Sequence, residues 1–238
     1  MLHLATFGGL SLYLNETPIT GVVTQRRQLA MLALLAVAGR AGVSRDKLVA
    51  LLWPAKDADA GRHLLNQLLY TQRRFAGDAG LFVGKKTLRL NAELIQTDVA
   101  AFESAIAAQE REKIPTIYRG PFLDGFFLTE AAEFEAWVTT QRSRYARECA
   151  DALETLAVAA AKSGNGGAAI GWHQRAQEID PLNARVALAL ADAFVLSGDR
   201  TSALRTLRWH TERVRKELET EPDASVLALQ ERLARGGP

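Results

Sequence analysis

The stretch that begins at Ser44 and ends at Leu90 predicts two helices joined by a short turn and followed by a hairpin. Ser44 is a suitable N-cap for the first helix, and Trp53-Pro54 ends that helix because proline disfavours a helical conformation in the residue before it. The second helix runs from near Ala58–Gly61 to Phe75 and ends before Gly77-Asp78-Ala79-Gly80, and a hairpin with two lysines at its tip follows. This order of elements is that of a winged helix-turn-helix.

The second helix has two chemically different sides when its residues are spaced as in an α-helix. One side carries Leu65, Leu68, Leu69 and Phe75, with Gln72 among them. The other side carries guanidiniums, amides, an imidazole and a phenol, contributed by Arg62, His63, Asn66, Gln67, Tyr70, Arg73 and Arg74. A helix with one apolar side and one side of such polar groups suits the major groove of DNA.

The position of each polar residue along this helix suggests its role. The N-terminal half of a recognition helix usually reaches base edges, which assigns Arg62, His63, Asn66 and Gln67 to the bases. Asparagine and glutamine can bond adenine bidentately, while arginine prefers guanine or phosphate. We expect the remaining three, Tyr70, Arg73 and Arg74, to hold phosphates. The alternative is a solvated polar face without a ligand.

Three further cations flank this helix in the sequence. Lys85 and Lys86 lie at the hairpin tip, where a wing meets the minor groove or the backbone, and lysine there adds affinity more than sequence information. Arg45 lies in the first turn of its helix, where the side chain and the helix N-terminus can both meet a phosphate. The alternative for the lysines is a solubilising tip.

The chain before this region predicts a strand pair and a buried helix. Leu2–Phe7 and Leu10–Leu14 alternate apolar with polar or small residues around Gly8-Gly9, and Ile19 begins a third short strand. Gln25–Ala38 is apolar over much of its surface, which favours the central helix of the domain.

The pattern changes near Thr97-Asp98, after which the sequence predicts almost only helix. The expected helices are 99–109, 115–119, 130–162, 167–178, 183–196, 200–217 and 223–235. Pro115 belongs in the first turn of its short helix, because proline in a helix interior costs about 3 kcal/mol. We therefore expect two domains, a winged helix-turn-helix over 1–97 and a helical domain over 98–238.

The helical part contains an internal repeat. Ser163-Gly164-Asn165 recurs as Ser197-Gly198-Asp199, an offset of 34 residues. Small or apolar residues coincide at the same offset, Ala157 with Ala191, Ala169 with Ala203, and Ile170 with Leu204. This offset is the tetratricopeptide period, in which helix pairs cross closely at small residues.

Charge is distributed unevenly along the chain. Residues 1–98 carry 12 Lys/Arg against 7 Asp/Glu, while residues 99–238 carry 17 against 20. A basic first part on a mildly acidic second part fits a nucleic-acid-binding head on a protein-interaction body. Cys149 is the single cysteine, which excludes an internal disulfide and fits a reducing cytoplasm. The longest apolar run, Leu29–Ala38, is too short to cross a bilayer.

No residue constellation points to catalysis, a metal or a cofactor. His173 and His210 lack companions at metal-ligand spacing. Glu130, Glu133 and Glu135 form a carboxylate cluster, but no nucleophile or glycine-rich phosphate loop accompanies it. We expect a solvated helix face or a partner-binding patch there, and a protein that is not an enzyme.

Several segments resemble the Streptomyces antibiotic regulatory protein class, which joins an OmpR-type winged helix to a bacterial transcriptional activator domain. The resemblance covers nearly the whole chain. It rests on Val43–Leu48, Leu52-Trp53-Pro54, Ala60-Gly61-Arg62, Gln72–Phe75, Tyr118–Phe126, Glu133–Trp137, Asp180-Pro181 and Gly198-Asp199. The Tyr-Arg-Gly-Pro-Phe-Leu segment together with Glu-Phe-Glu-x-Trp is the specific part. The chain departs from the family at Pro115, Leu68 and Gln72.

The resemblance implies a mainly α fold, with an α+β winged helix-turn-helix of OmpR type followed by an all-α domain of tetratricopeptide-like repeats. It also implies a cytoplasmic, nucleoid-associated transcriptional activator that binds direct repeats in double-stranded promoter DNA, as a homodimer, and contacts RNA polymerase. The alternative is a non-DNA-binding adaptor or ligand-sensing module that uses the helical repeats. The final Gly236-Gly237-Pro238 is typical of a linker, as in a fragment of a longer protein.

Overall fold

A computed structural model describes residues 1–21, 25–76 and 80–236, and residues 75 and 76 by their backbone alone. Its contacts divide the chain into two compact units, Met1–Tyr145 and Ala146–Pro238, which we describe separately. The sequence-based expectations for the Phe75 side chain, for the glycine-containing segment after it at 77–79, and for Gly237-Pro238 lie outside the described residues. Within the part described, no helix is long and apolar enough to cross a membrane.

The first unit begins with a small sheet in the order β3-β2-β1-β7. Its strands are β1 (Leu2–Ala5), β2 (Ser11–Leu14), β3 (Thr17–Pro18) and β7 (Ile95–Thr97). The predicted strand pair is confirmed, since β1 and β2 are antiparallel with Leu4 opposite Leu12. The third strand lies slightly earlier than expected. β7 runs parallel to β1 and returns the chain to the sheet after the winged helix.

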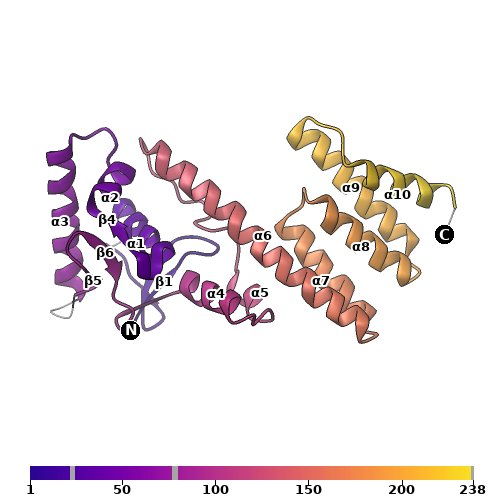
Figure 1. Ribbon diagram of the computed structural model, residues 1–238, viewed down its shortest axis with the longest axis horizontal. Coiled ribbons are helices and arrows are strands. Elements are labelled where there is room, and N and C mark those ends of the chain that lie inside the picture. The colour runs from indigo at the N-terminus through magenta and orange to yellow at the C-terminus, as the bar shows by residue number, and fades with distance from the viewer. Residues whose placement is uncertain (22–24, 77–79, 237–238) are drawn as a thin grey trace. The chain divides into compact units, whose positions relative to one another are not determined.

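Three helices and a second sheet form the body of this unit (Figure 1). The helices are α1 (Arg26–Ala38), α2 (Arg45–Leu52) and α3 (Ala58–Ala76), and a short 3-10 turn, η2 (Gly39–Ala41), follows α1. The second sheet has the order β4-β6-β5, with β4 (Val43–Ser44), β5 (Phe82–Val83) and β6 (Thr87–Leu90). All of α1 from Gln28 to Ala36 is buried, which confirms it as the central helix.

α2 begins and ends at the residues that the sequence predicted. The Ser44 hydroxyl accepts a hydrogen bond from the Lys47 backbone N–H at 3.2 Å, which caps α2. Trp53 follows α2 directly, and its N–H still donates to the Val49 carbonyl at 2.9 Å. Gly61 lies at the crossing of α2 and α3, where a Cβ would stand 2.3 Å from Val49 Cγ1. Close packing of these two helices therefore needs a glycine.

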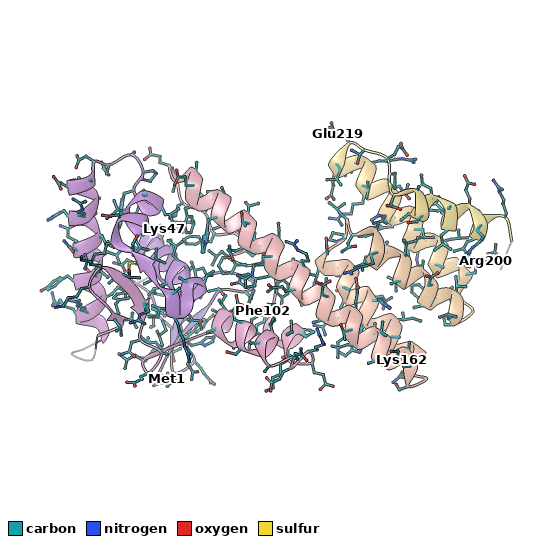
Figure 2. The ribbon with its side chains drawn as sticks, viewed as in Figure 1. Met1, Lys47, Phe102, Lys162, Arg200 and Glu219 are labelled. Atoms are coloured by element: carbon teal, nitrogen blue, oxygen red, sulfur yellow. The ribbon has the colours of Figure 1, made fainter. Side chains whose placement is uncertain are left out.

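The first unit continues well beyond the predicted boundary at Thr97-Asp98. The Asp98 carboxylate, at the start of α4 (Asp98–Ala107), accepts hydrogen bonds from Thr6 N at 2.7 Å, Thr6 Oγ1 at 2.5 Å and Phe7 N at 2.9 Å. An aromatic cluster then joins the sheet to later segments, through Phe7, Phe102, Tyr118, Phe122 and Tyr145 (Figure 2 labels Phe102). These contacts place the end of the compact unit inside a later helix. The division into 1–97 and 98–238, which follows the change of sequence pattern, stays a prediction.

The short helix that was expected to carry a proline in its first turn follows α4. Pro115 lies in the first turn of α5 (Ile114–Ile117), as predicted. The long α6 (Ala132–Lys162) comes next, and the compact units divide within it.

The second unit consists of the end of α6 and four further helices. These are α7 (Gly166–Ile179), α8 (Ala184–Leu196), α9 (Arg200–Leu218) and α10 (Ala224–Ala234). Its core includes Leu190, Phe194, Leu207, Val226 and Leu229.

The internal repeat is confirmed at the level of backbone geometry. Gly164 and Gly198 both have positive φ, 77° and 83°. Asn165 and Asp199 follow as N-caps with nearly identical dihedrals, φ −92° with ψ 72° and φ −92° with ψ 70°. Each side chain accepts a hydrogen bond from the N–H three residues later. The matched small residues Ala157, Ala169, Ala191 and Ala203 are all buried. The mainly helical fold with tetratricopeptide-like repeats is as expected.

Candidate nucleic-acid interface

The two sides of α3 lie as the sequence predicted. Leu65, Leu68, Leu69 and Gln72 are buried. The Gln72 amide packs inward and donates to Gln28 Oε1 at 3.3 Å. All seven residues assigned to the polar side are exposed: Arg62, His63, Asn66, Gln67, Tyr70, Arg73 and Arg74. α3 lies at the edge of its unit, and Figure 1 shows the helix along its full length.

Arg45 joins three elements at one end of this face. Its Nε donates to the Lys85 carbonyl at 2.8 Å, and its Nη1 donates to Asn66 Oδ1 at 2.8 Å. Its backbone N–H donates to the Lys86 carbonyl at 3.1 Å. The start of α2, the middle of α3 and the hairpin tip are thus held together. We call these four residues the Arg45 junction.

The junction fixes which way Asn66 presents its amide. Arginine has only donors, so the Asn66 oxygen must face the guanidinium. The Asn66 NH₂ group then points away from Arg45 and offers donors. The bidentate pairing of asparagine with adenine also uses the amide oxygen, which has two lone pairs and can accept from Arg45 and from adenine N6 together.

The hairpin tip depends on Gly84. This residue has φ 102°, and a Cβ there would stand 2.0 Å from the Thr87 carbonyl oxygen. The glycine lets the chain turn so that Lys85 and Lys86 stay exposed while their carbonyls meet Arg45.

Arg62 lies between two carboxylates that were not part of the sequence-based prediction. Its guanidinium is 3.5 Å from Asp46 Oδ1 and 3.3 Å from Asp59 Oδ1. The i,i+3 spacing of Asp59 and Arg62 was a usable signal for one of these pairs. Both acids are highly exposed, and each would repel a phosphate approaching Arg62.

Other members of the polar face contact one another. Gln67 Nε2 and His63 Nε2 are 2.9 Å apart, one turn of α3 from each other. The Arg74 guanidinium lies 5.9 Å from the centre of the Tyr70 ring. Arg27 was also missed as a structural residue, since its Nε donates to the Leu52 carbonyl at 2.9 Å and satisfies the end of α2. That contact joins residues 25 positions apart, so no local pattern reveals it.

The cysteine, histidine and glutamate residues that could suggest a catalytic or metal site have structural surroundings instead. Among the described residues, no group of three or more His, Cys, Asp or Glu could hold a metal. Burial raises the pKa of the Cys149 thiol to about 12 and lowers the pKa of His173. His210 Nδ1 is 3.1 Å from the Pro181 carbonyl. Glu135 accepts from the Leu128 N–H at 2.7 Å, so it supports the segment before α6.

Comparison with known proteins identifies a family and a similar fold among solved structures. A family model, described as the bacterial transcriptional activator domain, matches residues 88–234, more than half of the chain. A solved structure of Mycobacterium tuberculosis EmbR in complex with a low-affinity phosphopeptide is similar, with TM-score 0.71 and 22% identity. The match covers 100% of this chain and 66% of that one. The comparison with curated proteins found no match.

Proposed function

The chain belongs to the bacterial transcriptional activator domain family, and we propose that it regulates transcription by binding promoter DNA through its winged helix. The single observation that carries this proposal is the exposed polar side of α3, joined by the Arg45 junction to two hairpin lysines. The family is regulatory in type rather than enzymatic.

In the proposed complex, α3 enters the major groove of double-stranded DNA. Arg62, His63, Asn66 and Gln67 contact base edges from its N-terminal half. The other three polar residues of α3, Tyr70, Arg73 and Arg74, contact phosphates. While the Arg45 junction is intact, the Asn66 NH₂ group faces away from Arg45 and can donate to acceptors of the major groove, such as guanine N7 or O6, adenine N7 and thymine O4.

The hairpin supplies the wing. Lys85 and Lys86 contact the backbone beside the groove and contribute affinity. Arg45 uses two of its five donors on the protein, so the role expected from the sequence, a phosphate contact, falls to its remaining N–H groups. Its main contribution is to hold the wing at a fixed distance from α3.

The remaining parts of the proposal come from the family. The protein acts as an activator in the cytoplasm, at the nucleoid. It binds direct repeats as a homodimer and contacts RNA polymerase, with the helical domain as the interaction surface. The paired helices of the second unit support this, because stacked helical repeats form extended protein-binding surfaces.

Gel mobility shift with the DNA upstream of the protein's own gene tests the central step. Several phosphate contacts give an affinity that falls steeply with salt, so we expect clear binding at low salt and much weaker binding at physiological salt. Absence of binding at low salt would contradict the proposal.

One observation favours a second candidate, an adaptor that does not bind DNA. Arg62 is held by two carboxylates on the face that should meet phosphates. An adaptor would keep its cellular function when Arg62, Asn66 and Arg74 are replaced by alanine, whereas a DNA-binding regulator would lose it.

A further inference from the structure

The first unit contains a groove of about 1050 Å³ that lies outside the proposed DNA-binding face. Its walls are the paired strands β1 and β7, the helices α4 and α5, the end of α1, and the hairpin strand β6. All of these elements belong to the same compact unit. The volume is large enough for a small molecule of ordinary metabolite size.

Apolar side chains form much of the groove, and arginines stand around it. Leu35, Ala36 and Ile95 are buried, and Leu90 and Ile117 are partly buried. The arginines are Arg40 in η2, Arg89 in β6 and Arg119 after α5. An apolar interior with a few converging charges is the usual composition of a ligand site.

The three arginines are available for a ligand. Each is exposed, and among the described residues none of them has a carboxylate within ion-pair distance. They come from segments far apart in the sequence, so a chance run of basic residues does not explain their meeting at one groove.

One carboxylate lines the described part of the groove, against three arginines. Asp98 is the one acidic residue among the described lining residues. Its oxygens already accept hydrogen bonds from Thr6 N, Thr6 Oγ1, Phe7 N and Val99 N. The groove therefore carries an excess of positive charge over an apolar interior.

We propose that this groove binds a small organic anion with an apolar body, such as a carboxylate on a hydrocarbon or aromatic frame. The guanidiniums pair with the anionic group, since arginine matches carboxylate geometry in a bidentate fashion. The apolar body lies against the partly buried Leu90 and Ile117 side chains. The site is distinct from the DNA contacts of α3 and gives the regulator a place for an effector.

The groove shares a strand with the proposed wing. Arg89 and Leu90 line it from β6, which begins at Thr87 directly after the hairpin tip. A ligand that contacts Arg89 in one hairpin position better than another shifts the population of wing positions. The ligand-binding claim does not depend on this coupling and is tested without DNA.

Two fluorescent probes of nearly the same shape test the claim on the full chain. Anilinonaphthalene sulfonate carries an anionic group on an aromatic body, and phenylnaphthylamine is the uncharged counterpart. In the double variant Arg40→Gln and Arg119→Gln, we expect sulfonate affinity to fall about tenfold or more while affinity for the neutral probe changes little. Arg111→Gln, an exposed arginine of the same unit outside the groove, should bind both probes as the wild type does.

A second variant checks the place of binding without removing charge. Ala101 is exposed on α4 and lines the groove, so Ala101→Gln fills part of it and should weaken both probes. Octanoate should displace the sulfonate probe from the wild type at concentrations where octanol does not. Circular dichroism confirms that each variant is folded. Unchanged sulfonate affinity in the double variant, or equal displacement by octanol and octanoate, overturns the proposal.

Discussion

Arg62 shows how neighbouring charges change the surroundings of a single residue on the α3 face. Asp46 and Asp59 hold its guanidinium in the absence of DNA, and all three side chains are largely exposed. Exposed ion pairs contribute little to stability, so these acids matter chiefly through their charge near an approaching phosphate. In the proposed complex with DNA, they would also reduce binding to any duplex in which Arg62 finds no better partner.

Replacing Asp46 and Asp59 by asparagine should therefore strengthen binding to non-specific DNA by about threefold to tenfold at low salt. The gain should shrink as salt increases, because the repulsion is between exposed charges. Fluorescence anisotropy with a random-sequence duplex measures it, and Glu110→Gln, an acid in the turn before α5, is the control. Weaker binding by the double variant would show instead that the acids orient Arg62 for contact.

At the scale of elements, the repeat offers a built-in comparison between two helix caps. Asn165 and Asp199 occupy equivalent positions with nearly the same dihedrals, but Asn165 has an amide side chain and Asp199 has a titratable carboxylate. Hydrogen bonds from the Ser202 side chain and backbone lower the pKa of Asp199 below its usual 3.8. A carboxylate whose pKa is lowered by folding stabilises the native state above its unfolded pKa, and this stabilisation is lost as pH falls through the folded pKa.

Asp199→Asn should accordingly keep the cap and lose its pH dependence. The wild type and the variant should have similar melting temperatures near neutral pH. Below pH 3.8 the wild type should lose stability relative to the variant. Thermal unfolding followed by circular dichroism between neutral and acidic pH measures the difference. A constant difference at all pH values would mean that the carboxylate is not selectively stabilised by the fold.

The helices and strands could be predicted from the sequence where residues close together in the chain determine them. Caps, turn glycines and helical spacing predicted α2, α3, the hairpin and the repeat helices to within a few residues. The Arg45 junction and the Asp98 contacts were not predictable, because they join residues 40 and 92 positions apart. The polar face of α3 could be predicted, but the carboxylate from α2 beside Arg62 depends on how two helices pack.

At the scale of the whole molecule, the winged helix packs together with residues that follow Thr97 in the sequence, within one compact unit. The Asp98 carboxylate satisfies N–H groups of Thr6 and Phe7, which are buried residues. Phe7 further packs against aromatic rings contributed from as far along the chain as Tyr145. The N-terminal sheet therefore depends on segments that the sequence pattern assigned to the next domain.

This dependence predicts how fragments behave. A fragment of residues 1–145 should unfold cooperatively in denaturant, whereas a fragment of residues 1–97 should not. Within the full chain, Asp98→Ala should lower the free energy of unfolding of the first unit by about 3 kcal/mol, because it leaves buried donors without acceptors. Chemical denaturation monitored by tryptophan fluorescence tests both. Cooperative unfolding of the shorter fragment would contradict this account.

The central claim, that the α3 face is the DNA-reading surface, is tested most directly by fluorescence anisotropy of the triple variant Arg62→Ala, Asn66→Ala and Arg74→Ala. The DNA is a duplex that the wild type shifts, and Arg111→Ala is the matched control. Loss of two base contacts and one phosphate contact predicts an affinity about a hundredfold lower, with a shallower salt dependence. Affinity and salt dependence equal to those of the wild type, in a variant with unchanged helical content, would contradict the claim.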